Sequence, residues 1–529
     1  MTTFSPFAAR LARPTLALLG LGFGLAGCQT DVDMPMAASA GNASFQRYLA
    51  VGNSLTAGYA DNGLYLEGQQ NSYPSILAQQ FALAGGGQFR QPLFSDAQAA
   101  GSGYLTLTGF SATGAPITQT VPGTGGRGTS PAAAPYTKYL SAVENLGVPG
   151  IRLSDIQTLD FGNLNVLRPG GINATNFNPY FERITPDGSS QSYFQRVKSE
   201  IGTPAIAANG NNPAVPAVPS ANGNTTFFSC WLGNNDVLSY ATSGGALAAL
   251  SPAQYGITPF AAPADTFNRK AVRIINALTA NGAKGVVSSI PDVAGIPFFT
   301  TVGPSARASF AAANVPSAAP FVYTTGSIGP GAPNTKVAAT LGDIKNAAGG
   351  TLLLTLTAAP YIGLYGQATG KYYRDFYNQL KPGLPAAFTL AVFLSPLGIN
   401  VDTTKAFGQS TQNPFPSTLV LDATEQKTVL DATTSYNTSL QNAALAKGLA
   451  FFDANQFFRN IAANGVTTNG INNTANFITG NLFSLDGVHP TPRGYALVAN
   501  EIIRVINARY GASVPPVNPN AYRGILLPK

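Results

Sequence analysis

The chain has 529 residues, of which 45% are hydrophobic and only 10% are charged, against about 25% charged residues in an average soluble domain. Its net charge of +7 is spread thinly along the sequence. No basic run with interleaved aromatic residues occurs, which argues against a nucleic-acid partner. The length suffices for two or three average domains, or for one domain enlarged by long insertions.

Residues 1–27 have the organisation of an export signal. Two arginines, Arg10 and Arg13, precede an apolar run over 16–25 that is too short to serve comfortably as a transmembrane helix. The run ends in Leu-Ala-Gly directly before Cys28, an order that resembles a bacterial lipoprotein processing site. The resemblance implies cleavage before Cys28 and acylation of that cysteine. The alternative is an ordinary secretory signal in which the cysteine is incidental.

The residues after the signal predict an envelope protein held by lipid. Residues 28–44 are small and polar and predict a tether. Gln29 is not the aspartate associated with retention in the inner membrane, so the outer membrane is the expected location. Cys230 is the only other cysteine and cannot form an intramolecular disulfide, so the exported chain must rely on its core. Because Cys230 lies in an apolar run, we expect it to be buried in a strand.

Apolar segments and amphipathic segments alternate along the chain. Strands are expected at about 46–52, from about 143, at 227–232, from about 285 and at 449–453. Helices are expected at about 72–83, from Ser154 as an N-cap, and at about 264–281, 423–447 and 492–510. This order predicts an α/β fold with a parallel five-stranded sheet covered by helices on both faces. A membrane barrel is the alternative architecture, but it would need a long series of alternating ten-residue strands.

The predicted organisation is one domain over 45–512 with three insertions. The insertions, at about 85–138, 160–222 and 296–420, are rich in small and turn-forming residues. The largest contains apolar pieces at 351–356 and 387–394 that suit extra strands or a lid. Residues 513–529 predict a proline-rich tail that runs along the surface.

Ser54 lies where the first strand gives way to a tight turn and the start of a helix. The carboxyl edge of a parallel sheet is where open α/β folds bind ligands, and a helix N-terminus offers free N–H groups and a positive dipole end. A serine needs a base to act as a nucleophile, and the chain contains a single histidine, His489. We therefore expect Ser54 and His489 to belong to one site.

Four short blocks, in order along the chain, together resemble the SGNH, or GDSL-type, hydrolase family. They are Gly-Asn-Ser-Leu at 52–55, a turn glycine best matched by Gly150 with Gly147 as the alternative, Gly-Asn-Asn-Asp at 233–236 and Asp-Gly-Val-His at 486–489. Each block is weak alone, but four in order at strand ends or beside the last helix are specific. The family usually has aspartate where this chain has Asn53, a change that keeps hydrogen-bonding capacity and removes a charge.

The resemblance implies a flavodoxin-like three-layer α/β/α sandwich and a serine hydrolase mechanism. Ser54 would attack an ester carbonyl, His489 would move the proton, and Asp486 would orient the imidazole. The Ser54 N–H, the Gly150 N–H and the Asn235 side-chain amide would stabilise the oxyanion. No metal or cofactor is expected, because no ligand cluster or phosphate-binding glycine loop of the usual spacing occurs.

Each of these residues also has a simpler interpretation. Ser54 could only cap a helix, a lone histidine is more often structural, and Gly150 and Asn235 could be turn residues. Asp292 and Asp453 also follow strands, and we expect them to be structural.

The predicted function is hydrolysis of carboxylic esters by a monomeric, lipid-anchored extracytoplasmic esterase. Lipid acyl esters and O-acetyl esters of glycans are both open as substrates. One alternative is an acyltransferase that uses the same site with a sugar or alcohol as acceptor. The other is a non-catalytic glycan-binding surface lipoprotein, against which the complete triad argues.

Overall fold

The computed structural model describes residues 37–110, 116–127, 136–163, 177–202, 223–258, 267–332, 334–380 and 389–528. The chain divides into two units, 1–37 and 38–529, and the description below concerns the second. The predicted signal segment, Cys28 and most of the tether lie outside the described residues, as do parts of all three predicted insertions.

A parallel sheet occupies the centre of this unit, and its five strands are those expected from the sequence. They are β1 (Tyr48–Gly52), β4 (Asn145–Gly147), β5 (Phe227–Trp231), β6 (Lys284–Ser288) and β11 (Ala450–Phe452). Their order across the sheet is β11-β6-β5-β1-β4, and every pairing is parallel. All residues of β1 and β5 are buried, as expected for strands covered on both faces. The α/β prediction is therefore confirmed.

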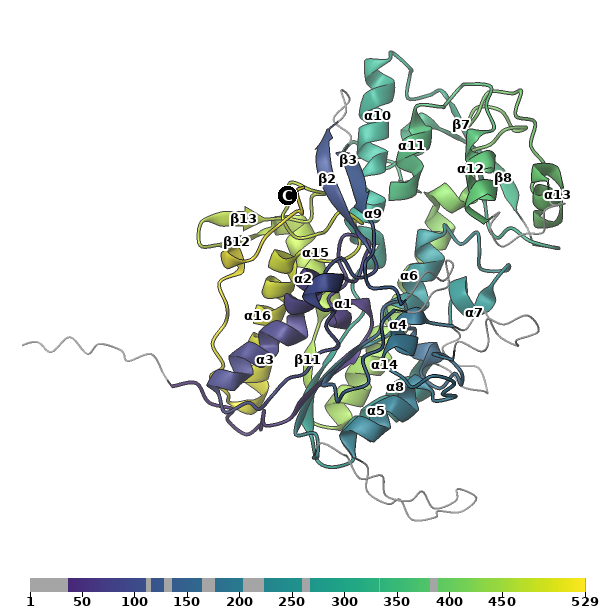
Figure 1. Cartoon of the computed structure of the whole chain (residues 1–529). Helices are drawn as coiled ribbons and strands as arrows, with labels where there is room; N and C mark the ends of the chain where they lie inside the picture. Colours follow the sequence, from purple (N-terminus) through teal and green to yellow (C-terminus); the bar gives the residue numbers. More distant parts are fainter. Residues whose placement is uncertain are drawn as a thin grey trace, which may run out of the picture. The chain divides into compact units, whose positions relative to one another are not determined.

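Successive side chains of each strand enter two separate cores, one on each face of the sheet. Leu49 and Val51 of β1 pack with α5 (Tyr193–Ile201), α8 (Phe267–Leu278) and α14 (Ala423–Ala446). Tyr48 and Ala50 pack with α3 (Tyr73–Leu83) and α16 (Pro492–Tyr510). Figure 1 shows α3 and α16 on one side of the strands and α5, α8 and α14 on the other. The sheet is therefore covered by helices on both faces.

The long helices agree with the sequence, but the helix expected from Ser154 is wrong. Residues Leu153–Asp155 form only a short 3-10 turn. A helix would pair the carbonyl of Ile156 with an N–H four residues on, but this carbonyl instead accepts the N–H of Phe194 at 2.6 Å. The N–H groups of Leu153 and Ser154 donate to the Asp236 carboxylate at 2.6 and 3.1 Å. Asp236 belongs to α6 (Asn235–Thr242), which follows β5. These bonds tie the segment to α6.

The insertion at 296–420 has a hydrophobic core of its own. It contains α9 (Pro297–Thr300), α10 (Val302–Ala312), α11 (Ala359–Ile362), α12 (Lys371–Leu380), α13 (Leu390–Leu394), the antiparallel pair β7 (Pro320–Thr325) and β8 (Thr335–Thr340), and β9 (Leu353–Leu354), which pairs with β10 (Val420–Leu421). The apolar piece at 351–356 thus contributes a strand. The described part of the piece at 387–394 forms α13 instead.

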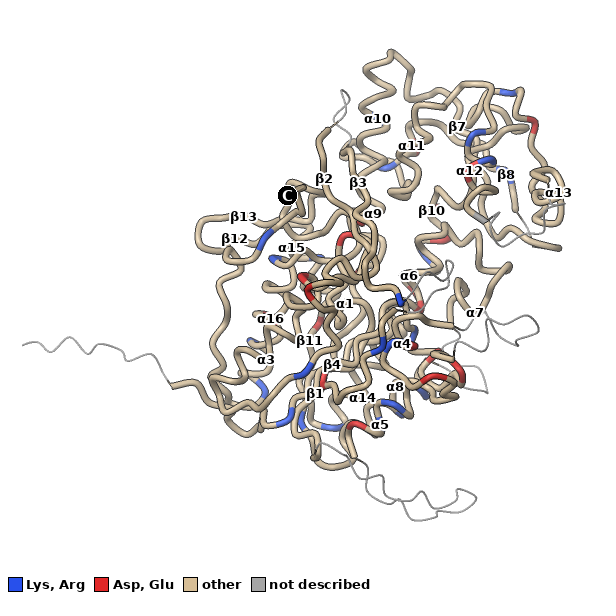
Figure 2. The backbone as a smooth tube through the Cα atoms, viewed as in Figure 1, with Lys and Arg blue, Asp and Glu red and all other residues tan. Residues whose placement is uncertain are grey.

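The remaining elements are short and lie around the sheet edges and loops. They are α1 (Ser54–Ala57), α2 (Leu66–Gln70), α4 (Pro179–Arg183), α7 (Pro252–Tyr255), α15 (Ala454–Asn464), and two antiparallel pairs, β2 (Tyr104–Phe110) with β3 (Pro116–Val121) and β12 (Val466–Thr468) with β13 (Ile471–Asn473). Figure 2 shows that charged residues are sparse along the described chain. Within the described ranges, no helix combines the length and the apolar character needed to cross a bilayer.

The segment that follows α16 is anchored more firmly than a surface tail. Asn507 and Asn500 of α16 each exchange two hydrogen bonds with the backbone, at Val514 and Val517 respectively. The Arg493 N–H, at the start of α16, donates to the carbonyl of Arg523 at 3.0 Å. Residues 513–523 therefore run back along α16, from its end to its beginning.

Candidate active site

Ser54, His489 and Asp486 form one hydrogen-bonded chain. Nε2 of His489 lies 2.9 Å from Oγ of Ser54, although 435 positions separate the two residues in sequence. Nδ1 of His489 lies 2.9 Å from Oδ2 of Asp486. The structure thus brings together the three residues expected to form the catalytic triad.

The tight contacts around β1 place Ser54 at the end of the strand. A Cβ at Gly52 would lie 2.0 Å from Oγ1 of Thr56 and 2.7 Å from the carbonyl of Trp231, so only glycine fits. The side-chain oxygen of Asn53 accepts the N–H of Leu55 at 3.0 Å and caps α1. The amide therefore provides this acceptor as a carboxylate would, without the charge.

The helix expected to start after the first strand begins at Ser54 and is short. It has a single turn, and Gly58, with φ of +82°, ends it. A single turn aligns few peptide dipoles. At this position an anion would therefore meet individual N–H groups rather than a strong helix dipole.

Asp486 is held by five donors. Its Oδ1 accepts the N–H groups of Val488 and His489, each at 2.8 Å, and the hydroxyl of Ser484 at 3.1 Å. Its Oδ2 accepts the Asn62 N–H at 3.0 Å in addition to the imidazole. Burial alone would raise the pKa of Asp486, but the imidazole and the backbone N–H groups lower it to about 2.

The ionised carboxylate decides the tautomer of His489. Because a carboxylate only accepts hydrogen bonds, Nδ1 must carry a proton, and Nε2 of the neutral ring is left with its lone pair. That lone pair faces the Ser54 hydroxyl. The arrangement can therefore remove the hydroxyl proton as Ser54 attacks an electrophile.

The structure separates the roles of Gly147 and Gly150. A Cβ at Gly147 would lie 2.3 Å from the backbone nitrogen of Ala57, so this glycine permits close packing of β4 against α1. Gly150 has φ of +80°, and a Cβ there would meet only the amide nitrogen of Asn178, at 3.7 Å. Gly150 thus supplies a left-handed turn with open space beside it, and it is the better match to the turn glycine of the second block.

Asn235 lies at the start of α6, directly after β5, and is only 7% exposed. Its side-chain nitrogen donates to the carbonyl of Ile151 at 2.8 Å. Since Ile151 follows Gly150, this bond fixes the Asn235 amide beside the Gly150 turn. One N–H of the amide is used there, and the same nitrogen carries a second donor.

Three tyrosines that the sequence analysis did not single out extend from the site. The Tyr59 ring lies 4.7 Å from the His489 ring, Tyr180 meets Tyr59 edge-on at 6.3 Å, and Tyr136 stacks on Tyr180 at 5.2 Å between ring centres. Burial and the nearby Asp486 raise the pKa of Tyr59, which keeps its phenol neutral. Tyr59 directly follows Gly58, which ends the short helix that starts at Ser54, so its closeness in sequence to Ser54 could have indicated a place near the site. Tyr136 and Tyr180 lie in irregular stretches that gave no such indication.

Of the two other acidic candidates, Asp453 makes a capping hydrogen bond and the Asp292 side chain makes none. Asp453 caps α15 by accepting the Gln456 N–H at 3.0 Å, and Asp292 precedes a short 3-10 turn.

Cys230 is 2% exposed, and burial raises the pKa of its thiol to about 12, so it is not a thiolate. No group of three or more residues able to hold a metal ion occurs among the described residues.

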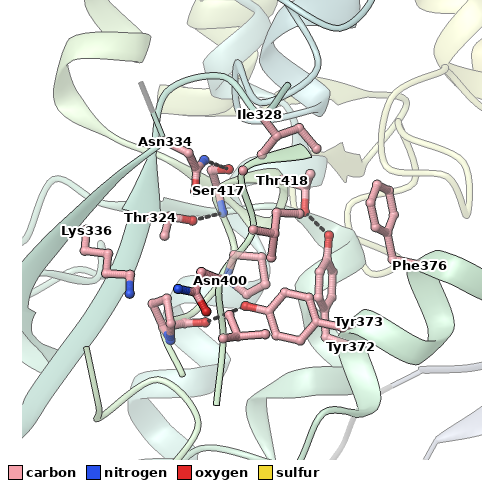
Figure 3. Close-up of a pocket in the computed structure, with 15 residues that line it drawn as sticks. Thr324, Ile328, Asn334, Lys336, Tyr372, Tyr373, Phe376, Asn400, Ser417 and Thr418 are labelled. Atoms are coloured by element: carbon pink, nitrogen blue, oxygen red, sulfur yellow. Dashed lines mark hydrogen bonds between the residues drawn. The ribbon is translucent and has the colours of Figure 1, made fainter. Parts of the chain in front are cut away.

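Two cavities in the 296–420 insertion differ in what they can hold. The cavity in Figure 3 has a volume of about 60 Å³, room for about two waters. The hydroxyls of Tyr372 and Tyr373 already bond to Thr418 and to the carbonyl of Pro414. It is therefore a packing gap.

A larger pocket, of about 490 Å³, lies between the end of α6 and the insertion. Its lining includes Thr242 of α6, Thr357 and the aromatic rings of Tyr361 and Phe376. Leu356, next to Thr357, lies close to Gly487 in the fourth block. The pocket has the size of a small-molecule site, and α6, which contributes Thr242 to its wall, begins at Asn235 of the third block.

Comparison of the chain with protein-family models, with curated proteins and with solved structures found no match. The resemblance to SGNH hydrolases rests on the four sequence blocks and on the geometry described above.

Proposed function

We propose that the protein is an SGNH-type serine esterase that cleaves carboxylic esters through an acyl-enzyme. The observation that carries this proposal is the continuous chain of hydrogen bonds from Ser54 through His489 to Asp486, with both contacts at 2.9 Å. The strand order also supports it: numbered along the chain, the strands lie 2-1-3-4-5 across the sheet, which is the flavodoxin-like order. In such a sheet the carboxyl ends of the first and third strands flank a natural ligand site.

The acylation step follows from the positions of the protons. Oγ of Ser54 attacks the ester carbonyl while Nε2 of His489 takes the hydroxyl proton. The carbonyl oxygen becomes an oxyanion, for which we propose the N–H groups of Ser54 and Gly150 and the side-chain amide of Asn235 as donors. Collapse of the intermediate breaks the bond to the alcohol, which leaves with the proton from Nε2.

Deacylation repeats the sequence with water. His489 removes a proton from water, the hydroxide adds to the acyl carbonyl, and the proton returns to Oγ as the acid leaves. An acyltransferase would differ only in using an alcohol in place of water. Because no observation favours a particular acceptor, hydrolysis is the function that we propose.

We further propose that acyl chains on Cys28 anchor the enzyme to the cell envelope, with the outer membrane as its location. The apolar run before Cys28 and the small residues that precede it support this. The substrate would then be an ester exposed in the envelope, either a lipid acyl ester or an O-acetyl glycan.

Hydrolysis of p-nitrophenyl esters by residues 29–529 tests the proposal. The parent protein is expected to hydrolyse these esters, and Ser54→Ala is expected to lower kcat by at least about 10³-fold. Ser305→Ala is a matched control, because Ser305 is exposed on α10 and far from the triad in sequence. Equal activity of the parent and Ser54→Ala would overturn the assignment of the nucleophile, and loss of activity in Ser305→Ala would show that the assay reports folding.

A further inference from the structure

A turn over residues 60–63, in which only Asn62 is exposed, lies directly behind the proposed catalytic carboxylate. Asp61 and Asn62 both have left-handed backbone angles, with φ of 52° and 61°. The backbones of Ala60 and Gly63 close the turn through two hydrogen bonds, at 3.0 and 2.9 Å. Asp and Asn tolerate this conformation better than most residues, yet two in succession still cost free energy. Other contacts must therefore hold the turn in place.

The backbone N–H groups of this turn support Asp486 by two routes. The Asn62 N–H donates directly to Oδ2, the oxygen that also faces His489. The Asp61 N–H donates to Oγ of Ser484 at 2.9 Å, and Ser484 in turn donates to Oδ1 of Asp486. A displacement of the turn would thus disturb both oxygens of the carboxylate.

The carboxylate of Asp61, which is fully buried, anchors the turn. Its Oδ1 accepts the Leu485 N–H at 3.1 Å, and its Oδ2 accepts the Tyr65 hydroxyl at 2.7 Å. Arg523, in the segment that returns along α16, is its cationic partner at 3.4 Å. The same guanidinium donates to the Tyr65 hydroxyl and to Glu67, each at 2.5 Å.

The charges around this anchor explain why a cation is needed. Burial raises the pKa of Asp61, Arg523 is the strongest influence in the opposite direction, and Asp486 adds repulsion. Glu67 also faces the guanidinium. Without Arg523, the turn would have to hold a buried carboxylate close to a second one with no positive partner, an arrangement that is strongly destabilised.

We propose that the Asp61–Arg523 pair is a positioning device for catalysis, through which the segment after α16 holds Asp486 and hence the His489 ring in register with Ser54. The ring nitrogens of His489 bond to Asp486 and Ser54, so Arg523 and Asp61 would act on the imidazole through Asp486. This proposal rests on the esterase function proposed above and goes beyond it, because it makes activity depend on a segment outside the four sequence blocks.

Kinetics per active site can separate positioning from folding. Active sites of residues 29–529 are counted by titration with a p-nitrophenyl phosphonate ester, and kcat and KM for p-nitrophenyl acetate are then measured. Arg523→Ala is expected to lower kcat per titrated site by about 10- to 100-fold, by analogy with the loss seen when residues that orient metal ligands are removed. KM is expected to stay within about twofold of the parent value. Arg504→Ala, which removes an exposed arginine of α16 that pairs with Glu501, is expected to match the parent.

Two further variants test the link to Asp61. Arg523→Lys keeps a cation and is expected to recover part of the lost kcat. Asp61→Asn suits the left-handed backbone and is expected to lower kcat as Arg523→Ala does. Because the pair acts as a unit, the double variant Arg523→Ala/Asp61→Asn is expected to have a kcat within about threefold of that of the worse single variant.

The outcomes distinguish this inference from the esterase proposal. If the parent is active and depends on Ser54 while Arg523→Ala and Asp61→Asn retain the parent kcat per site, the positioning role is wrong and the esterase stands. The role is also wrong if Arg523→Ala only reduces the number of titratable sites, because that is the signature of a structural contact. If the parent shows no Ser54-dependent turnover, the function proposed above fails first.

Discussion

Replacing Asp486 by asparagine should abolish most of the activity while leaving the shape of the site intact. Every hydrogen bond that the carboxylate makes in the structure is accepted, with three donors at Oδ1 and two at Oδ2. The amide of the substituted side chain must point its NH2 group either at the three donors that faced Oδ1 or at the two that faced Oδ2. If it faces His489, two donors confront each other unless the imidazole changes tautomer, so that Nδ1 accepts and Nε2 carries the proton.

The changed tautomer sets the size of the effect. With a proton on Nε2, His489 cannot take the Ser54 proton, and the same substitution in another serine hydrolase triad lowers kcat about 10⁴-fold, or about 5.5 kcal/mol in activation free energy. Stability should change too. The pKa of Asp486 is about 2 in the fold against an ordinary 3.8, which corresponds to about 2 kcal/mol in favour of the ionised form.

The pH dependence of the free energy of unfolding provides a second test of this substitution. Because the pKa of Asp486 is lowered by folding, its contribution is complete above pH of about 4 and is lost as the pH falls towards 2. The Asp486→Asn protein lacks this contribution, so its urea midpoint should be lower than that of the parent at pH 7 and approach it in acid. Asp431→Asn is the matched control, since Asp431 is exposed and pairs only with Lys427 among the ion pairs described.

The assay is kcat on p-nitrophenyl acetate at pH 7 for the parent, Asp486→Asn and Asp431→Asn, with folding checked by circular dichroism. A loss of less than about tenfold in a folded Asp486→Asn protein would refute the reasoning, because it would show that His489 works without a fixed tautomer. A loss of similar size in the control would show that the assay does not isolate the site.

Three further predictions concern other parts of the chain. Gly147→Ala should lower the urea midpoint because its Cβ meets backbone at 2.3 Å, at a cost of roughly 1–3 kcal/mol. Gly150→Ala, strained by its φ of +80°, should lower both the urea midpoint, by roughly 1–2 kcal/mol, and kcat; a loss of kcat larger in Gly147→Ala than in Gly150→Ala would contradict their assigned roles. Burial raises the pKa of Glu425 from 4.5 to about 7, so stability should fall by about 3 kcal/mol as pH rises from 4.5 to 7, and Glu425→Gln should remove that slope in urea titrations; an unchanged slope would contradict this. Cys28→Ser in the full chain should move the protein from the membrane to the soluble fraction, and unchanged membrane association would argue against the lipid anchor.

The sheet and the contacts among Ser54, His489 and Asp486 were predictable because the sequence signals behind them are local. Each buried strand is a short apolar run that ends in a turn, and parallel strands bring their carboxyl ends to one edge. The single histidine left little choice of base. The block at 486–489 also places its aspartate and histidine within one turn, so their contact needs no long-range information.

The parts that were not predicted depend on contacts between distant segments. The helix expected from Ser154 does not form because Phe194, from a distant segment, donates its N–H to the carbonyl of Ile156 that the helix would need. Arg523 reaches Asp61 across 462 positions, and apolar periodicity says nothing about such a pair. The Asp-Asn-Gly sequence at 61–63 did carry a signal for a left-handed turn, but nothing local indicated that the turn supports Asp486.

The central claim is that Ser54 is the nucleophile of a covalent mechanism. Incubation of the active protein with a p-nitrophenyl phosphonate ester, followed by peptide mass spectrometry, tests it most directly. We expect one phosphonyl group per molecule, on Ser54, with release of one p-nitrophenol and complete loss of esterase activity. Complete inactivation with the adduct on any other residue, or full phosphonylation of Ser54 with activity retained, would contradict the account.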